Sequence, residues 1–112
     1  MPTIAYQGAT AILTKTATGA GSTYEVNRKA EDAKQRVFQA AGTTSAGSGS
    51  ATVVVQVSCN DSDWITLGTI TLTLGTSSTS DGFASDAPWP YVRGNCTAIS
   101  GTNASVTLYM GF

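Results

Sequence analysis

The feature that most constrains this fold is a strictly alternating stretch that is followed by a turn and a second apolar run. Every second residue of 51–59 is apolar or small and would share one face of a β-strand, namely Ala51, Val53, Val55, Val57 and Cys59. The next residues, Asn60-Asp61-Ser62-Asp63, are typical of a turn because Asn and Asp hydrogen-bond to their own backbone and tolerate left-handed dihedral angles. Residues 64–74 then run back, so the pattern predicts a β-hairpin.

The returning strand of this hairpin carries an irregularity at Gly68. Ile65 and Leu67 have one parity, whereas Ile70, Leu72 and Leu74 have the other. One extra residue would restore a single inward face, so a β-bulge is predicted at Gly68–Thr69.

The rest of the chain reads as short strands between polar, glycine-rich connections. We expect strands at 9–18, 22–27, 36–41, 82–84, 91–100 and 104–110. Residues 42–50 and 75–81 read as loops by composition. Val92, Cys96 and Ala98 are expected on one face of their strand.

Two segments lack strand character. Residues 1–8 are expected to form an extended N-terminal arm outside a single domain at 9–112. Residues 25–36 hold seven of the thirteen charges and are expected to be a solvated loop or a helical turn, with a mixed-charge contact patch as the alternative. No long helix is predicted, so the fold class is all-β: an antiparallel two-sheet β-sandwich, with the jelly roll as one form of it.

Composition narrows the classes of partner. Only 12% of residues are charged, and 30 residues are Thr or Ser, which suits packed contacts inside an assembly. A net charge of −1 argues against nucleic-acid binding. No apolar run approaches the roughly 20 residues of a membrane span, and the N-terminus does not resemble a signal peptide. We therefore expect synthesis in a cytoplasm and no membrane partner.

Catalytic chemistry is not expected. The chain has no histidine, which excludes Ser/His/Asp and Cys/His nucleophile systems. The loop carboxylates Asp61, Asp63, Asp81 and Asp86 are interpreted as turn residues, with general acid/base work or a calcium site as weaker alternatives. No cofactor and no metal site is predicted, and the protein is not expected to be an enzyme.

The two cysteines, Cys59 and Cys96, lie on different predicted strands. A disulfide between them is geometrically conceivable. In a cytoplasmic protein, the expectation is two reduced, buried thiols that act as small apolar residues.

The aromatic side chains leave two interpretations open. Trp64, Trp89 and Tyr91 could stack on a sugar, or the tryptophans could anchor the edge of the core. The second interpretation is favoured for Trp64, which begins a strand. Trp89 is more open, because Pro88 and Pro90 hold it in a stiff loop.

From Phe38 onward the chain resembles small virion proteins of tailed bacteriophages. The matching segments are Phe38-Gln39-Ala40-Ala41-Gly42-Thr43-Thr44, Trp64-Ile65-Thr66-Leu67-Gly68-Thr69-Ile70-Thr71-Leu72, Asp81-Gly82-Phe83 and Pro88-Trp89-Pro90-Tyr91-Val92-Arg93-Gly94-Asn95-Cys96-Thr97-Ala98-Ile99-Ser100-Gly101-Thr102. These residues are structural, so the resemblance implies a shared sandwich and no shared active site.

Within that group the resemblance is greatest to head decoration, or cementing, proteins. It implies a location on the head surface of a virion, the major capsid protein as partner, and symmetric homo-oligomers on the shell. Candidate protein-interface residues are Ile4 and Tyr6 in the arm, and Trp89, Tyr91 and Arg93. The alternatives are a tail- or fibre-associated carbohydrate-binding module and a cytoplasmic scaffold unrelated to phage.

Overall fold

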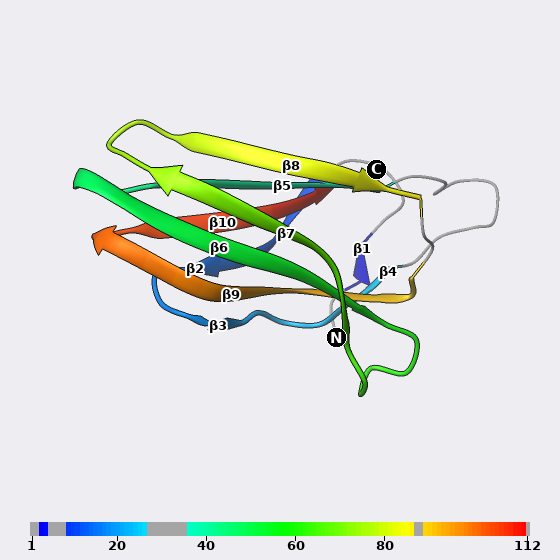
Figure 1. Cartoon of the computed structure of the whole chain (residues 1–112). Coiled ribbons are helices and arrows are strands. Elements are labelled where there is room, and N and C mark those ends of the chain that lie inside the picture. Colours follow the sequence, from blue (N-terminus) through cyan, green and yellow to red (C-terminus); the bar gives the residue numbers. More distant parts are fainter. Residues whose placement is uncertain (1–2, 5–8, 27–35, 87–88, 112) are drawn as a thin grey trace.

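A computed structural model of the chain describes residues 3–4, 9–26, 36–86 and 89–111, and the described part is built of strands (Figure 1). The strands are β1 (Thr3–Ile4), β2 (Ala9–Lys15), β3 (Gly19–Ala20), β4 (Tyr24–Val26), β5 (Arg36–Thr43), β6 (Ala46–Ser58), β7 (Ile65–Leu74), β8 (Thr79–Ser85), β9 (Tyr91–Thr102) and β10 (Ser105–Gly111). The expectation of an all-β domain is confirmed.

The strands form two sheets that face each other. Sheet A has the order β1-β4-β9-β6-β7, with β3 also paired to β9, and sheet B has the order β2-β10-β5-β8. The pairings are nested: β6 pairs with β7, β5 with β8, β3 and β4 with β9, and β2 with β10. Successive levels of this nest alternate between the sheets, which is a hairpin rolled over on itself. The sandwich is therefore a jelly roll.

The core lies between the sheets and follows the alternation of the strands. Ala51, Val53, Val55 and Val57 of β6 are all fully buried, as the sequence pattern predicts. From sheet B, Phe38, Leu108 and Met110 face them across the interior. Burial of such side chains contributes about 1.5–3 kcal/mol each, so this central layer dominates the stability of the fold.

The existence of a bulge in β7 is confirmed, but it lies one residue earlier than the predicted Gly68–Thr69, because the extra residue is Leu67. Val55 pairs with Gly68 and Gln56 pairs with Thr66, so Leu67 has no partner on β6. Gly68 lies beneath the aromatic ring of Phe83 from sheet B, where a Cβ would come within 2.5 Å of the ring. The bulge therefore turns a residue without a side chain toward that ring.

A second bulge, in β9, was not predicted. Val53 pairs with Cys96 and Thr52 with Ala98, which leaves Thr97 as the extra residue. The placement of Ala98 on the buried face is consequently wrong, because the bulge turns Ala98 outward, and Ile99 packs against the core instead.

The expectation of a loop at 42–50 is also wrong. Strand β5 extends to Thr43 and β6 begins at Ala46, so only Thr44 and Ser45 lie between them. Gly49 explains the difference, because a Cβ there would lie 2.1 Å from the Ser100 carbonyl oxygen. The glycines permit close approach of two backbones in a sheet, which composition does not distinguish from loop flexibility.

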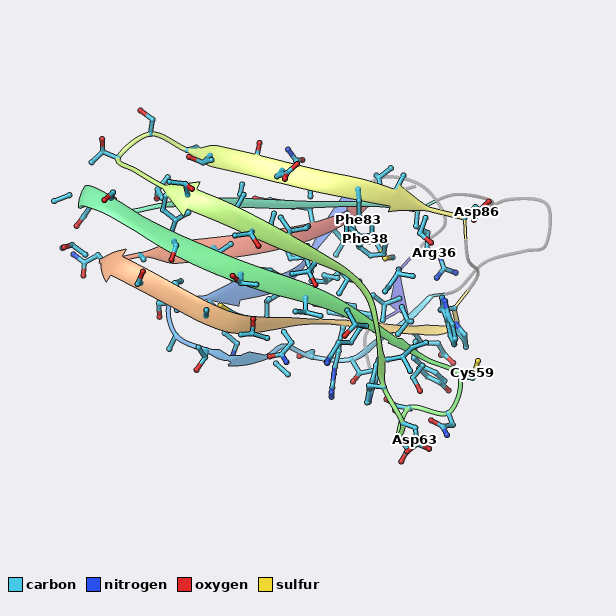
Figure 2. All side chains as sticks on the ribbon, viewed as in Figure 1. Arg36, Phe38, Cys59, Asp63, Phe83 and Asp86 are labelled. Atoms are coloured by element: carbon cyan, nitrogen blue, oxygen red, sulfur yellow. The ribbon has the colours of Figure 1, made fainter. Side chains whose placement is uncertain are left out.

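The cysteine expectations are confirmed only in part. Both cysteines are free, and Cys96 is buried as predicted. Cys59 is exposed, because β6 ends at Ser58 and Cys59 already belongs to the turn. Figure 2 shows Cys59 and Asp63 at the end of the sandwich, away from Phe38 and Phe83 between the sheets.

Of the expected arm, the structure describes Thr3 and Ile4. Their backbone forms a two-residue parallel pairing with Glu25 and Val26 of β4. Tyr6 lies outside the described residues, as does most of the charged segment 25–36. Arg36, the last residue of that segment, is the buried first residue of β5.

Candidate interaction surfaces

The turn between β6 and β7 is held together by its own side chains. Ser58 Oγ accepts hydrogen bonds from the backbone N–H groups of Asn60 and Asp61, and donates to Asn60 Oδ1. Asn60 Oδ1 also accepts from the N–H groups of Ser62 and Asp63. Asp61 has φ +57°, which an aspartate tolerates better than most residues. The turn is therefore a preformed structure, and the interpretation of its carboxylates as turn residues accounts for these contacts.

Beside this turn, Arg93 and Trp64 form a contact on the outer face of sheet A. The guanidinium carbon of Arg93 lies 4.4 Å from the centre of the Trp64 ring, in cation–π geometry. Arg93 Nε donates a 2.8 Å hydrogen bond to Gln56 Oε1, and the two residues are paired across β9 and β6. All three side chains are half-buried. We call Gln56, Trp64 and Arg93, together with Tyr91, the arginine patch.

The sequence-predicted interface residues do not all meet. Tyr91 and Arg93 alternate with buried Val92 and Gly94, so both face outward on sheet A. Half-buried Trp89 instead packs against the core, and its carbonyl oxygen accepts a hydrogen bond from Arg36 Nη1. Trp89 thus occupies the position of a core-edge anchor.

Ile4 lies on β1 beside β4, and Tyr6 is not among the described residues. The contact of Arg93 with Gln56 and Trp64 was not anticipated, because it depends on strand register.

The outer face of sheet B forms a second surface, which we call the sheet B face. Its residues alternate with the buried ones and are Ala11, Thr14, Val37, Gln39, Ala41, Thr43, Ser80, Gly82, Ala84, Ser105, Thr107 and Tyr109. None of them is charged. Val37 and Tyr109, on the neighbouring strands β5 and β10, are 48% and 39% exposed, which is high for large apolar side chains. Most of its side chains are small, and Val37 and Tyr109 are two apolar projections from it.

An open groove of about 540 Å³ runs between the edges of the two sheets. Its lining comes from β2 and from residues 20–24, and includes Ile12, Leu13, Lys15 and Tyr24. Among the described residues of the lining, Lys15 is the one that carries a charge. Such a lining provides packing area but no pair of groups for acid/base catalysis.

The described residues can be considered as nucleophiles and as metal ligands. Burial raises the pKa of the Cys96 thiol, and the hydrogen bond to the Ala98 carbonyl and the nearby Lys15 offset this effect only in part. The Cys96 thiol is therefore in its protonated, unreactive form near neutral pH.

Over residues 3–4, 9–26, 36–86 and 89–111, no three His, Cys, Asp or Glu side chains lie close enough together to bind a metal ion. The same residues include no helix long and apolar enough to cross a bilayer.

Comparison with known proteins gives one structural neighbour. No protein-family model matches the chain, and no curated protein matches it. Among solved structures, the chain is similar to the crystal structure of the PBSX exported protein XepA, with a TM-score of 0.59 and 13% sequence identity. The similarity covers 95% of this chain but 37% of that chain, so the present chain spans little more than a third of the length of XepA. At this identity the likeness shows a shared fold.

Proposed function

We propose that this chain is a non-enzymatic structural protein of a tailed-bacteriophage virion. Its specific role is that of a decoration, or cementing, protein, which binds the outside of the head shell and staples neighbouring major capsid subunits. It acts there as a symmetric homo-oligomer.

The observation that carries this proposal is the sheet B face. A freely exposed surface normally carries both signs of charge, which keep a protein soluble. The described residues of this face include no charged side chain, and the face exposes Val37 and Tyr109 on adjacent strands. Small side chains allow another protein to approach the sheet closely, and burial of the two apolar projections would stabilise the contact. The face has the character expected of a surface that is covered in an assembly.

Two further observations support the same role. The sequence from Phe38 onward resembles small virion proteins of tailed phages. The structural neighbour, the PBSX exported protein XepA, is a phage-related protein, and this fold likeness is loosely consistent with a phage role. Jelly rolls serve both viral shells and lectins, so the fold does not choose between a shell protein and a sugar-binding module.

The carbohydrate-binding alternative loses its main candidate residue. It relied on Trp89 and Tyr91 as stacking platforms. Trp89 packs against the core, and Tyr91 faces outward on sheet A, so the two rings do not form one platform.

The experiment is binding to purified head shells that lack this protein, measured by co-sedimentation. We compare the wild-type chain with a double variant, Val37→Ser and Tyr109→Ser. As a matched control, Thr71→Ser and Thr73→Ser alter two exposed side chains on the outer face of β7. We expect the first variant to lose shell binding while its circular dichroism spectrum stays unchanged. We expect the control variant to keep its binding. Absence of wild-type binding would overturn the proposed function, and equal binding by both variants would remove the sheet B face from it.

A further inference from the structure

Arg93 is held in position before any partner is present. Its guanidinium is stacked on Trp64 and hydrogen-bonded through Nε to Gln56. An arginine side chain that is free in solution loses rotamer entropy when a partner fixes it. At this site the ring and the amide have already restricted the side chain, so a partner would meet a preorganised group.

The contacts that the structure describes for Arg93 include no negatively charged group. Within the described residues its partners are a neutral amide and an aromatic ring, and no ion pair with a carboxylate is formed. Because Nε is occupied by Gln56, the two terminal nitrogens, Nη1 and Nη2, form the free edge of the guanidinium. That edge has the spacing of a carboxylate and can donate two parallel hydrogen bonds to it.

We propose that Arg93 binds a carboxylate side chain of a protein partner, with Trp64 and Tyr91 packing against the chain that carries it. The inference rests on the proposed function for the place of that partner, which is an Asp or Glu of the shell. Because the arginine patch lies on the outer face of sheet A, opposite the sheet B face, this carboxylate belongs to a second shell subunit and not to the one that the sheet B face covers. Arginine, tryptophan and tyrosine are the residue types that most often dominate binding energy at protein interfaces.

The surrounding charges favour a single carboxylate over a polyanion. Asp61 and Asp63 lie in the adjacent turn, and exposed Glu25 is paired with Tyr91 across the strands. Asp63 is engaged by the side-chain amide of Asn60. A nucleic-acid backbone would bring many negative charges against these acids, whereas one carboxylate needs only the edge of Arg93.

The structure offers a nearly isosteric test variant, Gln56→Glu. The substitution keeps the acceptor for Arg93 Nε and supplies a carboxylate from within the chain, which competes with that of the partner. The matched control is Thr71→Glu, which adds the same charge to an exposed position of β7 on the same outer face. We expect both proteins to fold. Loss of a charge-assisted contact should weaken binding of Gln56→Glu to head shells about tenfold to a hundredfold, while Thr71→Glu stays within about threefold of the wild type.

A second measurement does not depend on shells. The side-chain N–H signals of Arg93 and Trp64 are followed by NMR during titration with an acetylated, amidated Glu-Gly-Glu peptide, and then with its Gln-Gly-Gln analogue. The inference is supported if the wild type shows saturable shifts with the Glu peptide but not with the Gln peptide, and if Gln56→Glu shows no such shifts. This support holds even if the wild type fails to bind shells, which would overturn the proposed function and not the inference. Equal shell binding by Gln56→Glu and the wild type would overturn the inference. So would equal shifts with the two peptides, or shifts as large as those of the Glu peptide in a third titration with the neutral sugar chitotriose.

Discussion

Replacement of Gly49 by alanine tests the claim that the glycine-rich stretch before β6 is a sheet element and not a flexible loop. A Cβ at this position would lie 2.1 Å from the carbonyl oxygen of Ser100 and 3.0 Å from Cα of Gly101. Real Cβ atoms essentially never come closer than 3.0 Å to another heavy atom, and the first distance is shorter than this limit by roughly 0.9 Å. Both neighbours are backbone atoms of β9, so no side chain can rotate away and the two strands must separate locally.

The expected cost follows from that separation. Overpacking of a well-packed site costs about 1–3 kcal/mol, and each ladder hydrogen bond that lengthens costs about 1 kcal/mol more. We therefore expect Gly49→Ala to lower the free energy of unfolding by about 2–4 kcal/mol, out of the roughly 5–15 kcal/mol typical of a domain. The corresponding drop in Tm is roughly 10–20 °C.

Gly75→Ala is the matched control. Nothing lies within 4 Å of a Cβ built at Gly75, and the residue does not have a positive φ. This variant should be neutral, or more stable by about 0.4–1 kcal/mol, because alanine restricts the unfolded chain. Urea denaturation followed by tryptophan fluorescence measures both. Equal stability of the two variants would refute the close approach of β6 and β9 on which this part of the fold depends.

Three further predictions concern the cysteines and the turn. Alkylation of the native protein should modify Cys59 rapidly and Cys96 only after unfolding, and intact-mass measurement would detect a disulfide as missing additions. Burial raises the pKa of Cys96 above its ordinary 9.0, so the thiol ionises at lower pH in the unfolded chain than in the folded protein, and the free energy of unfolding should fall as pH rises above 9.0. Denaturation at pH 8 and pH 10 should show a smaller fall for Cys96→Ala than for the wild type. An identical fall in the two proteins would contradict the assignment. Asn60→Ala should destabilise the protein by about 1–2 kcal/mol, because it leaves the N–H groups of the turn without their acceptor, whereas Ser62→Ala should stay within about 0.5 kcal/mol of wild type in the same denaturation assay.

The sequence predicts the parts of this fold that depend on local alternation. The inward face of β6, the turn after it and the bulge near Gly68 follow from period-two patterning and turn chemistry, and these fixed the fold class. Thr97 and Gly49 show where such reasoning fails. Both reflect how β9 meets β6, which is a long-range pairing that leaves no local signature.

The candidate surfaces were less accessible to prediction for the same reason. Arg93 and Gln56 are 37 residues apart and meet only through strand register. Val37 and Tyr109 look like ordinary apolar strand residues, and their exposure becomes evident only when the inner face of each strand is known. Trp89, which its flanking prolines suggested for a binding loop, packs against the core.

The most direct test of the central claim is whether the protein is found in virions and, there, with the heads. If the proposed function holds, the chain belongs to a tailed phage. Particles of that phage are dissociated into heads and tails, the two fractions are separated on a density gradient, and the chain is quantified in each by mass spectrometry against the major capsid protein. The proposed function predicts that the chain is found with the heads, in a fixed ratio to the major capsid protein. Recovery of the chain with the tails, or with neither fraction, would contradict it.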